Sequence, residues 1–337
     1  MRAVRHPLAA PLLLAACAHA YDPAAFRAAL REANRDPDRQ QAIASLERTR
    51  QAYPEKRDET DLAIARIYAQ IGQPERSLEV LEDAHRAGVF FGLLPQMDWI
   101  QPLRYLRDFQ PLLDRDVQLR LRADRSSSMR FEVVRPQGYS SAKVYPLFIV
   151  LHAGGDDMRN ARRYWRSDGL GRFLVVYVQS FRHLTSSSYT WIGGDLESRA
   201  RLRRIFDEVA TRYNVDPRRV LIGGMSAGGM MSLDVVFHDA LPVTGFIVNC
   251  PVVPNDFNPA MADDLRRRGI RGVILTGDRD FSLDSQKAVV DALTRAGVPH
   301  RFTIIPGQGH MIPADFPARL DAALAELLDS TTLAPAR

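Results

Sequence analysis

The sequence has few cysteines and no long hydrophobic run. Only two cysteines, Cys17 and Cys250, occur among its 337 residues. Cys17 lies in the N-terminal leader, so the rest of the chain holds a single thiol and cannot form an internal disulfide. No stretch approaches about 18 consecutive apolar residues, so the sequence predicts no transmembrane helix. The cysteine count does not indicate whether the protein works in an oxidising or a reducing compartment, so the compartment has to be inferred from the N-terminal leader.

The chain also lacks the charge clustering of a nucleic-acid surface. Its positive charge comes almost wholly from arginine, spread along the chain and interleaved with acids, with a formal net charge of +5. No Lys/Arg block alternates with aromatic residues, which predicts that nucleic acid is not a partner. The histidines outside the proposed site have no partners at metal-ligand spacing, so we expect no metal and no cofactor. Hydrophobic residues at 46% and charged residues at 25% are typical of a globular protein.

Residues 1–20, MRAVRHPLAAPLLLAACAHA, have the layout of a secretory signal: a basic start, a short apolar run and small residues. Two processing sites compete. The sequence Leu-Ala-Ala-Cys ending at Cys17 resembles a bacterial lipobox, whose cysteine is lipidated, whereas Ala18-His19-Ala20 would release a soluble protein. We favour the lipobox. The protein is therefore expected to be exported, as a periplasmic or outer-membrane-anchored lipoprotein or, alternatively, as a secreted protein, with a lipid on Cys17 as its only membrane attachment.

Residues 21–125 are predicted to form a small all-α domain, because Ala, Leu, Arg, Glu and Gln dominate and these favour helices. Apolar positions in 61–70 populate one broad face. A break follows at Ile71-Gly72-Gln73-Pro74, and 76–88 repeats the pattern and ends at a glycine that can cap a helix. A further helix is predicted over 38–53.

The hairpin resembles a tetratricopeptide repeat, in the segment LAIARIYAQIGQPERSLEVLEDAHRAG. The matching positions are Ala65, Tyr68, Gly72, Leu81, Ala84 and Gly88. Such arrays usually need about three units or more to be stable. The resemblance therefore implies helices that pack on the second domain as a cap, or that bind a protein partner.

Residues 126–337 are predicted to form an α/β domain with a mostly parallel, doubly wound sheet. Short apolar runs alternate with helical stretches, and this alternation is typical of a sheet covered on both faces. The strand-like runs lie at 129–136, 145–155, 172–180, 219–226, 243–250, 272–278 and 300–307. The predicted helices are Leu196–Tyr213, Gly228–Phe237, Ser285–Ala296 and Pro317–Leu328. Sites in such sheets form where the strands end, so the residues after each strand carry the functional argument.

Ser226 is the candidate nucleophile. It lies in Gly224-Met225-Ser226-Ala227-Gly228, a G-x-S-x-G motif directly between a predicted strand and a predicted helix. In that context the serine sits on a sharp turn whose neighbours must be small, and the helix N-terminus faces developing negative charge.

The glycine loop after the second strand, His152-Ala153-Gly154-Gly155, is expected to supply one of two backbone N–H groups that bind an oxyanion. The N–H of Ala227 is the other. Gly154 is the preferred donor of this loop, with Ala153 or Gly155 as alternatives. His152 is expected to hold the loop by side-chain hydrogen bonds. Gly155 and Trp191 are candidates for contact with the substrate, and for Trp191 simple packing is the favoured alternative.

The base and the acid follow later strands. His310 lies in Gln308-Gly309-His310 after the last strand, and Asp280 follows the strand that ends at Gly277. Asp278 and Asp284 are the alternatives for the acid that orients the histidine. The order serine, aspartate, histidine is that of α/β-hydrolases and differs from the order in chymotrypsin and subtilisin.

These motifs resemble the α/β-hydrolase fold superfamily, in particular its compact esterases: feruloyl and acetylxylan esterases, polyhydroxybutyrate depolymerases and small carboxylesterases. The stretch NVDPRRVLIGGMSAGG is similar to that branch's approach to its nucleophile. The loop HAGG departs from the family's HGGG. The resemblance implies a serine esterase that acts on a small or polymer-linked ester. An acyltransferase, a peptidase or a non-catalytic lipid-anchored scaffold protein are the alternatives.

Overall fold

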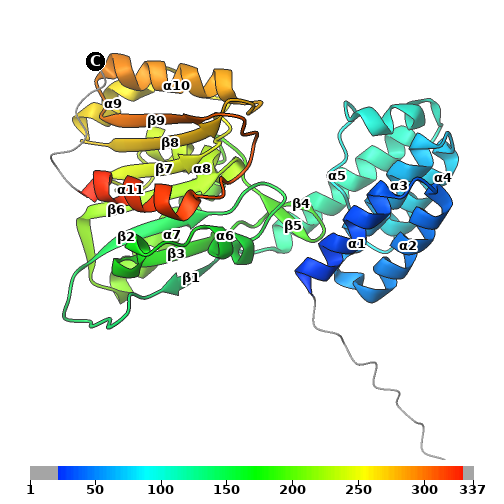
Figure 1. Cartoon of the computed structure of the whole chain (residues 1–337), viewed down its shortest axis with the longest axis horizontal. Coiled ribbons are helices and arrows are strands. Elements are labelled where there is room, and N and C mark those ends of the chain that lie inside the picture. The colour runs from blue at the N-terminus through cyan, green and yellow to red at the C-terminus, as the bar shows by residue number, and fades with distance from the viewer. Residues whose placement is uncertain (1–21, 329–337) are drawn as a thin grey trace, which may run out of the picture. The chain divides into compact units, whose positions relative to one another are not determined.

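The computed structural model describes residues 22–328, and the chain within them divides into two compact units (Figure 1). The first unit runs to Ala87 and includes Pro95–Leu112. The second consists of Gly88–Leu94 and the chain from Leu113 onward. The predicted signal segment with Cys17 lies outside the described residues. None of the helices within 22–328 is long and apolar enough to cross a membrane.

The first unit is built of consecutive helices, as predicted. Neighbouring helices contact one another along the chain. The elements are α1 (Pro23–Arg35), α2 (Arg39–Ala52), the 3-10 turn η1 (Pro54–Lys56), α3 (Arg57–Gln70), α4 (Pro74–Arg86) and η2 (Asp98–Tyr105). The predicted hairpin is confirmed as α3 and α4, and Gly72 makes the turn with φ +74°. Ser77 on α4 donates a hydrogen bond of 2.8 Å to the Ala65 carbonyl on α3.

The division between the units differs from the predicted boundary at 125/126. Helix α5 (Phe109–Ser126) belongs to the second unit from Leu113 on, and so does the segment 88–94. The buried Asp116 carboxylate joins these two stretches, because it accepts hydrogen bonds from the N–H groups of Phe91 (2.7 Å) and Leu93 (2.9 Å). Contacts between residues far apart in the sequence fix this boundary, and a composition change cannot reveal them.

The second unit contains a seven-stranded sheet in the order β1-β3-β2-β6-β7-β8-β9. β1 is antiparallel to β3, and the other neighbours are parallel. The strands are β1 (Arg130–Val134), β2 (Tyr145–Leu151), β3 (Leu174–Gln179), β6 (Val215–Met225), β7 (Gly245–Asn249), β8 (Arg271–Gly277) and β9 (His300–Ile305). All seven predicted strands are present.

Helices cover both faces of this sheet (Figure 1). On β2, Leu147 and Ile149 face one core while Phe148 and Val150 face the other, because successive side chains of a strand point to opposite faces. The first core includes α7 (Leu196–Arg212), α8 (Ala227–Phe237), α9 (Met261–Arg267) and α10 (Leu283–Ala296). The second includes α6 (Met158–Tyr164), η3 (Gly169–Arg172) and α11 (Phe316–Leu328).

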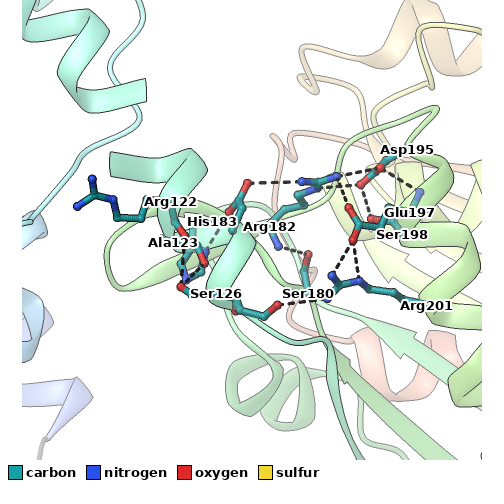
Figure 2. A network of polar contacts seen from close by, with 12 residues as sticks. Arg122, Ala123, Ser126, Ser180, Arg182, His183, Asp195, Glu197, Ser198 and Arg201 are labelled. Carbon is teal, nitrogen blue, oxygen red and sulfur yellow. Dashed lines mark hydrogen bonds and ion pairs between the residues drawn. The ribbon is translucent and has the colours of Figure 1, made fainter. Parts of the chain in front are cut away.

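A separate two-stranded hairpin, β4 (Arg182–Thr185) and β5 (Ser188–Thr190), was not predicted. A polar network anchors it to α5 and to the start of α7 (Figure 2). Arg182 contacts Asp195 at 2.9 Å and Asp124 at 3.8 Å, and both His183 Nδ1 and its backbone N–H approach Asp124. Asp195 also caps the start of α7 by accepting a hydrogen bond from the Glu197 N–H. Charge-assisted contacts thus hold two strands too short to be stable alone.

The second core should depend strongly on α11. Replacing Leu320 by alanine removes a fully buried side chain from that core and should lower the free energy of unfolding by about 2–5 kcal/mol. The matched control is Leu196→Ala on α7, where the side chain is 74% exposed and the change should stay within about 0.5 kcal/mol. Urea denaturation followed by circular dichroism measures both. Equal losses in the two variants would contradict this packing.

Candidate active site

Ser226 occupies the turn between β6 and α8. Its backbone has φ 54° and ψ −118°, a conformation that costs energy for a residue with a side chain and that clusters at functional sites. The surrounding chain holds this conformation, because the Ser226 N–H donates to the Asn249 carbonyl (3.1 Å) and its carbonyl accepts from Met230 and Val252. The side chain is thereby fixed at the carboxyl edge of the sheet.

Glycines make this turn possible. A Cβ on Gly224 would lie 2.6 Å from the carbonyl carbon of Gly228, and a Cβ on Gly228 would collide with the carbonyl groups of Leu151 and His152. The first turn of α8 therefore packs directly on the end of β2. The close approach brings the loop after β2 next to Ser226.

His310 lies between Ser226 and Asp280. Its Nε2 is 2.8 Å from Ser226 Oγ, and its Nδ1 is 3.0 Å from Asp280 Oδ2. The three side chains come from the ends of three different strands: β6, β8 and β9. The structure thus brings together three residues that lie far apart in the sequence. A hydroxyl, an imidazole and a carboxylate in this order can transfer the hydroxyl proton to the imidazole.

Asp280 is held as a carboxylate inside the protein. Burial by itself would raise its pKa, but hydrogen bonds from Cys250, from the Ser282 N–H (2.7 Å) and from His310 outweigh burial and lower it. Thr276 Oγ1 donates a further bond of 3.1 Å. A negative charge therefore faces Nδ1 of His310 at neutral pH.

Cys250 is a buried neighbour of this acid. Burial, and then its contact with Asp280, raise the pKa of the Cys250 thiol to about 12. The thiol stays protonated and can donate to the carboxylate. No sequence pattern indicates this contact, because the two residues come together only when β7 and β8 pair.

The two alternative acids lie away from His310. Asp278 is exposed, and the Asp284 side chain is 98% exposed and pairs with Lys287. A residue missed by the sequence analysis contacts the imidazole instead: the ring of Phe281 lies 4.3 Å from the ring of His310. Phe281 directly follows Asp280 and is 75% exposed. The one sequence feature that could have indicated this contact is that Phe281 stands next to the predicted acid, Asp280.

The glycine loop after β2 lies against the start of α8. A Cβ on Gly154 would be 3.3 Å from the Cβ of Ala227, so these two predicted donors are neighbours. The Gly155 N–H is already used, because it donates to the Tyr189 carbonyl at 2.9 Å. Of the loop's glycines this favours Gly154 over Gly155 as an oxyanion donor. Ala227 begins α8, and backbone N–H groups at a helix N-terminus can bind negative charge.

The side chain of His152 holds this loop, as predicted. Its Nε2 accepts a hydrogen bond from the Ser180 N–H (3.1 Å), so Nδ1 carries the proton and donates to the Ala153 carbonyl (2.8 Å). The hairpin braces the loop from the other side, through a bridge between Asp156 and Tyr189. The hairpin that the sequence analysis missed therefore positions the candidate oxyanion site.

Trp191 is buried rather than open to a cavity. It is 2% exposed, and its Nε1 donates a hydrogen bond of 3.0 Å to the His152 carbonyl. This supports the packing alternative, with a role under the loop in place of direct substrate contact. Tyr177 and Phe181 are buried as well: the Tyr177 hydroxyl donates to the Trp165 carbonyl, and Arg201 covers the Phe181 ring.

A cavity of about 440 Å³ opens beside His310 and the glycine loop. Gly155 lines it, in agreement with its suggested place near the substrate. The lining is His152, Ala153, Gly154, Gly155, Asp156, Ala161, Tyr164, Trp165, Met225, His310, Met311 and Ile312. This size and the mixture of apolar side chains with backbone donors are typical of a small-molecule site.

Two clusters within 22–328 hold side chains at metal-ligand distances from one another: Cys250 with Asp280 and His310, and Asp234 with His238 and Asp256. In the first, the carboxylate and the imidazole already hydrogen-bond to each other. In the second, the Arg199 guanidinium donates to Asp234 at 2.6 Å and to Asp256 at 3.4 Å. Hydrogen bonds and a fixed cation therefore account for both clusters.

No family model matches the sequence, and no curated protein is similar to it. Solved structures are similar in fold. An uncharacterized protein from Bacillus cereus ATCC 10987 matches with a TM-score of 0.52 and 19% identity, over 92% of this chain and all of its own. A carboxylesterase from Mesorhizobium loti matches with a TM-score of 0.50 and 20% identity, over 59% of this chain and 96% of its own.

The second unit has the α/β-hydrolase fold. The predicted fold class is thereby confirmed, including the helical hairpins that precede the sheet. At these identities the α/β-hydrolase likeness establishes the fold alone, and the chemistry has to be argued from the residues of this chain.

Gly228 should tolerate no side chain. Gly228→Ala would drive Cβ into the carbonyl groups of Leu151, at the end of β2, and of His152 just after it, and should lower the free energy of unfolding by about 3 kcal/mol or more. Gly171→Ala is the matched control, because a Cβ there meets nothing within 4 Å. Urea denaturation compares the two variants. A Gly228→Ala protein as stable as the control would contradict the close packing of α8 on β2.

His152 should make the protein less stable in weak acid. Its complete burial lowers its pKa from the ordinary 6.5 to about 4, against the opposing effects of Ala153 and Asp157. The unfolded chain binds this proton as the pH falls through about 6.5, whereas the folded chain does not until about pH 4. Stability should therefore fall by about 3 kcal/mol across this window. Urea denaturation at pH 7 and pH 4.5 measures the loss, and His152→Gln should lose less.

A direct check is the NMR titration of the His152 imidazole. A midpoint near the ordinary value would contradict the expected burial of the neutral ring. The lowered pKa of Asp280 acts below this window, so the two effects can be separated.

Proposed function

We propose that this chain is a carboxylic-ester hydrolase that forms an acyl-enzyme on Ser226. The observation that carries the proposal is the continuous contact from Ser226 Oγ through His310 to Asp280, at 2.8 and 3.0 Å. The strained turn at Ser226 and the α/β-hydrolase fold support it. Esters are favoured as substrates because one similar structure is a carboxylesterase.

In the first half of the reaction, Ser226 Oγ attacks the ester carbonyl carbon while His310 Nε2 accepts its proton. The carbonyl oxygen becomes an oxyanion, and the N–H groups of Gly154 and Ala227 stabilise it. Asp280 accepts a hydrogen bond from Nδ1–H, which fixes the tautomer and stabilises the imidazolium. When the carbonyl re-forms, the alcohol leaves with the proton from Nε2.

In the second half, water replaces the alcohol. His310 Nε2 takes a proton from water as its oxygen attacks the acyl carbon, and the same N–H groups bind the second oxyanion. Collapse of that intermediate returns the proton to Ser226 Oγ and releases the acid. The steps balance without a metal or a redox cofactor.

Loss of the nucleophile or the base should abolish turnover. Ser226→Ala and His310→Ala should each lower kcat on p-nitrophenyl butyrate by about 10⁴- to 10⁶-fold, and Ser226→Ala should abolish labelling by a fluorophosphonate. Ser128→Ala, at an exposed serine, is the control and should keep both. The rates on acetate, butyrate and octanoate esters would show how long an acyl chain the cavity accepts.

The same experiment separates the rival functions. Folded wild-type protein that is neither labelled nor active would overturn the hydrolase and favour a scaffold protein that uses its helices. Acyl transfer to an added alcohol in preference to water would indicate an acyltransferase. Labelling without ester turnover, together with cleavage of peptide substrates, would indicate a peptidase.

A further inference from the structure

Arginines gather on one face of α6, in the second unit. Arg159, Arg162, Arg163 and Arg166 are spaced so that a helix brings them to the same side, although α6 itself ends at Tyr164. Like charges at this spacing destabilise a helix. Folding stability therefore does not explain why these arginines cluster. Binding of an anionic ligand, which would offset their repulsion, does.

These arginines line a cavity of about 540 Å³ beside β1 and β3. Arg135, in the turn after β1, adds a fifth guanidinium. Among the described residues that line it, Glu132 is the only acid. Burial raises the pKa of the Tyr177 hydroxyl at the cavity wall to about 12, so this phenol adds no negative charge.

Contacts within the protein neutralise little of this charge. Arg162 pairs with Glu132, and Arg166 Nε donates to the Arg163 carbonyl at 3.1 Å. In the part of the chain that the structure describes, the Arg159 and Arg163 side chains make neither a hydrogen bond nor an ion pair. Ser167 Oγ, a buried atom of the same lining, has no hydrogen-bond partner within residues 22–328.

Helix α6 separates this cavity from the one beside His310. Tyr164 and Trp165 line the cavity at the glycine loop, whereas Arg162 and Arg163 line the arginine cavity. A molecule with its ester at Ser226 can therefore place another group near the arginines by passing around one short helix.

We propose that the arginine cavity binds an oxyanion with at least two negative charges, carried by phosphate or carboxylate groups, and that this anion is the charged part of the ester substrate. Guanidinium groups bind both kinds of oxyanion through paired hydrogen bonds. The anion site is inferred from the cavity alone. Its link to the substrate rests on the proposed ester hydrolysis.

Calorimetry on the full Ser226→Ala chain tests the anion site without turnover. Inorganic pyrophosphate and citrate, titrated at constant ionic strength, represent the phosphate and the carboxylate source. At least one should bind, and the double variant Arg162→Gln/Arg166→Gln should raise its Kd about tenfold or more. Arg203→Gln/Arg204→Gln, an equal charge change at two exposed positions of α7, should leave Kd unchanged.

A second variant keeps the test decisive if the double variant folds poorly. Glu132→Gln removes the acid that competes for Arg162 and should tighten binding. Absence of binding by both probes, an equal loss in Arg203→Gln/Arg204→Gln, or binding confined to vesicles of phosphatidylglycerol would each overturn the proposed small-anion site.

Kinetics on the wild-type chain test the substrate part. The KM for p-nitrophenyl 10-phosphonodecanoate, whose phosphonate is a dianion in weak base, should be lower than for p-nitrophenyl decanoate, and Arg162→Gln/Arg166→Gln should remove the difference. Equal KM values would overturn the link to the substrate. If neither ester is hydrolysed while calorimetry still detects the anion, ester hydrolysis fails and the anion site stands.

Discussion

The close packing of α8 against the end of β2 is the constraint on which the site depends. Because Gly224 and Gly228 carry no side chain, the turn between β6 and α8 can press against the carbonyl groups that end β2. The turn that makes this approach holds Ser226 at a positive φ and sets Ala227 beside Gly154. Ser226 and the two proposed oxyanion donors are therefore positioned by a single steric condition.

The glycine loop depends on support from elements distant in the sequence. Its backbone is held by His152 from within, by Trp191 from beneath and by Tyr189 of the hairpin from the side. The hairpin in turn contacts the segment before residue 95, through Ser186 and Phe90, and α5 through Asp124. The segments before and after Pro95–Leu112, which itself belongs to the helical unit, thus support the loop beside Ser226. All of these contacts lie inside the second unit.

Local patterns in the sequence were enough to predict the seven strands, because buried parallel strands are continuous apolar runs. They were also enough to select Ser226, Asp280 and His310, since each follows such a run. The hairpin escaped detection because Arg182–Thr185 and Ser188–Thr190 are short and polar, and contacts remote in the sequence stabilise them. The boundary near residue 113 was missed for the same reason. The periodicity of apolar residues does not indicate which distant segment an acidic residue such as Asp116 will bind.

Helix α6 shows that the order of charged residues in a sequence does not reveal how they cluster on the surface. Its arginines are interleaved with Ala161 and Trp165, so the sequence shows no basic block, yet those two side chains are buried in the core and leave the arginines together on the opposite side. When the apolar face of an amphipathic helix packs in a core, its charged residues gather on the other face and produce a strong local electrostatic potential. Because Tyr164 of the same turn faces the cavity at His310, one short element can connect the recognition of charge with the placement of a reacting carbonyl. The proposed anion site thus follows from the same packing that fixes the second core.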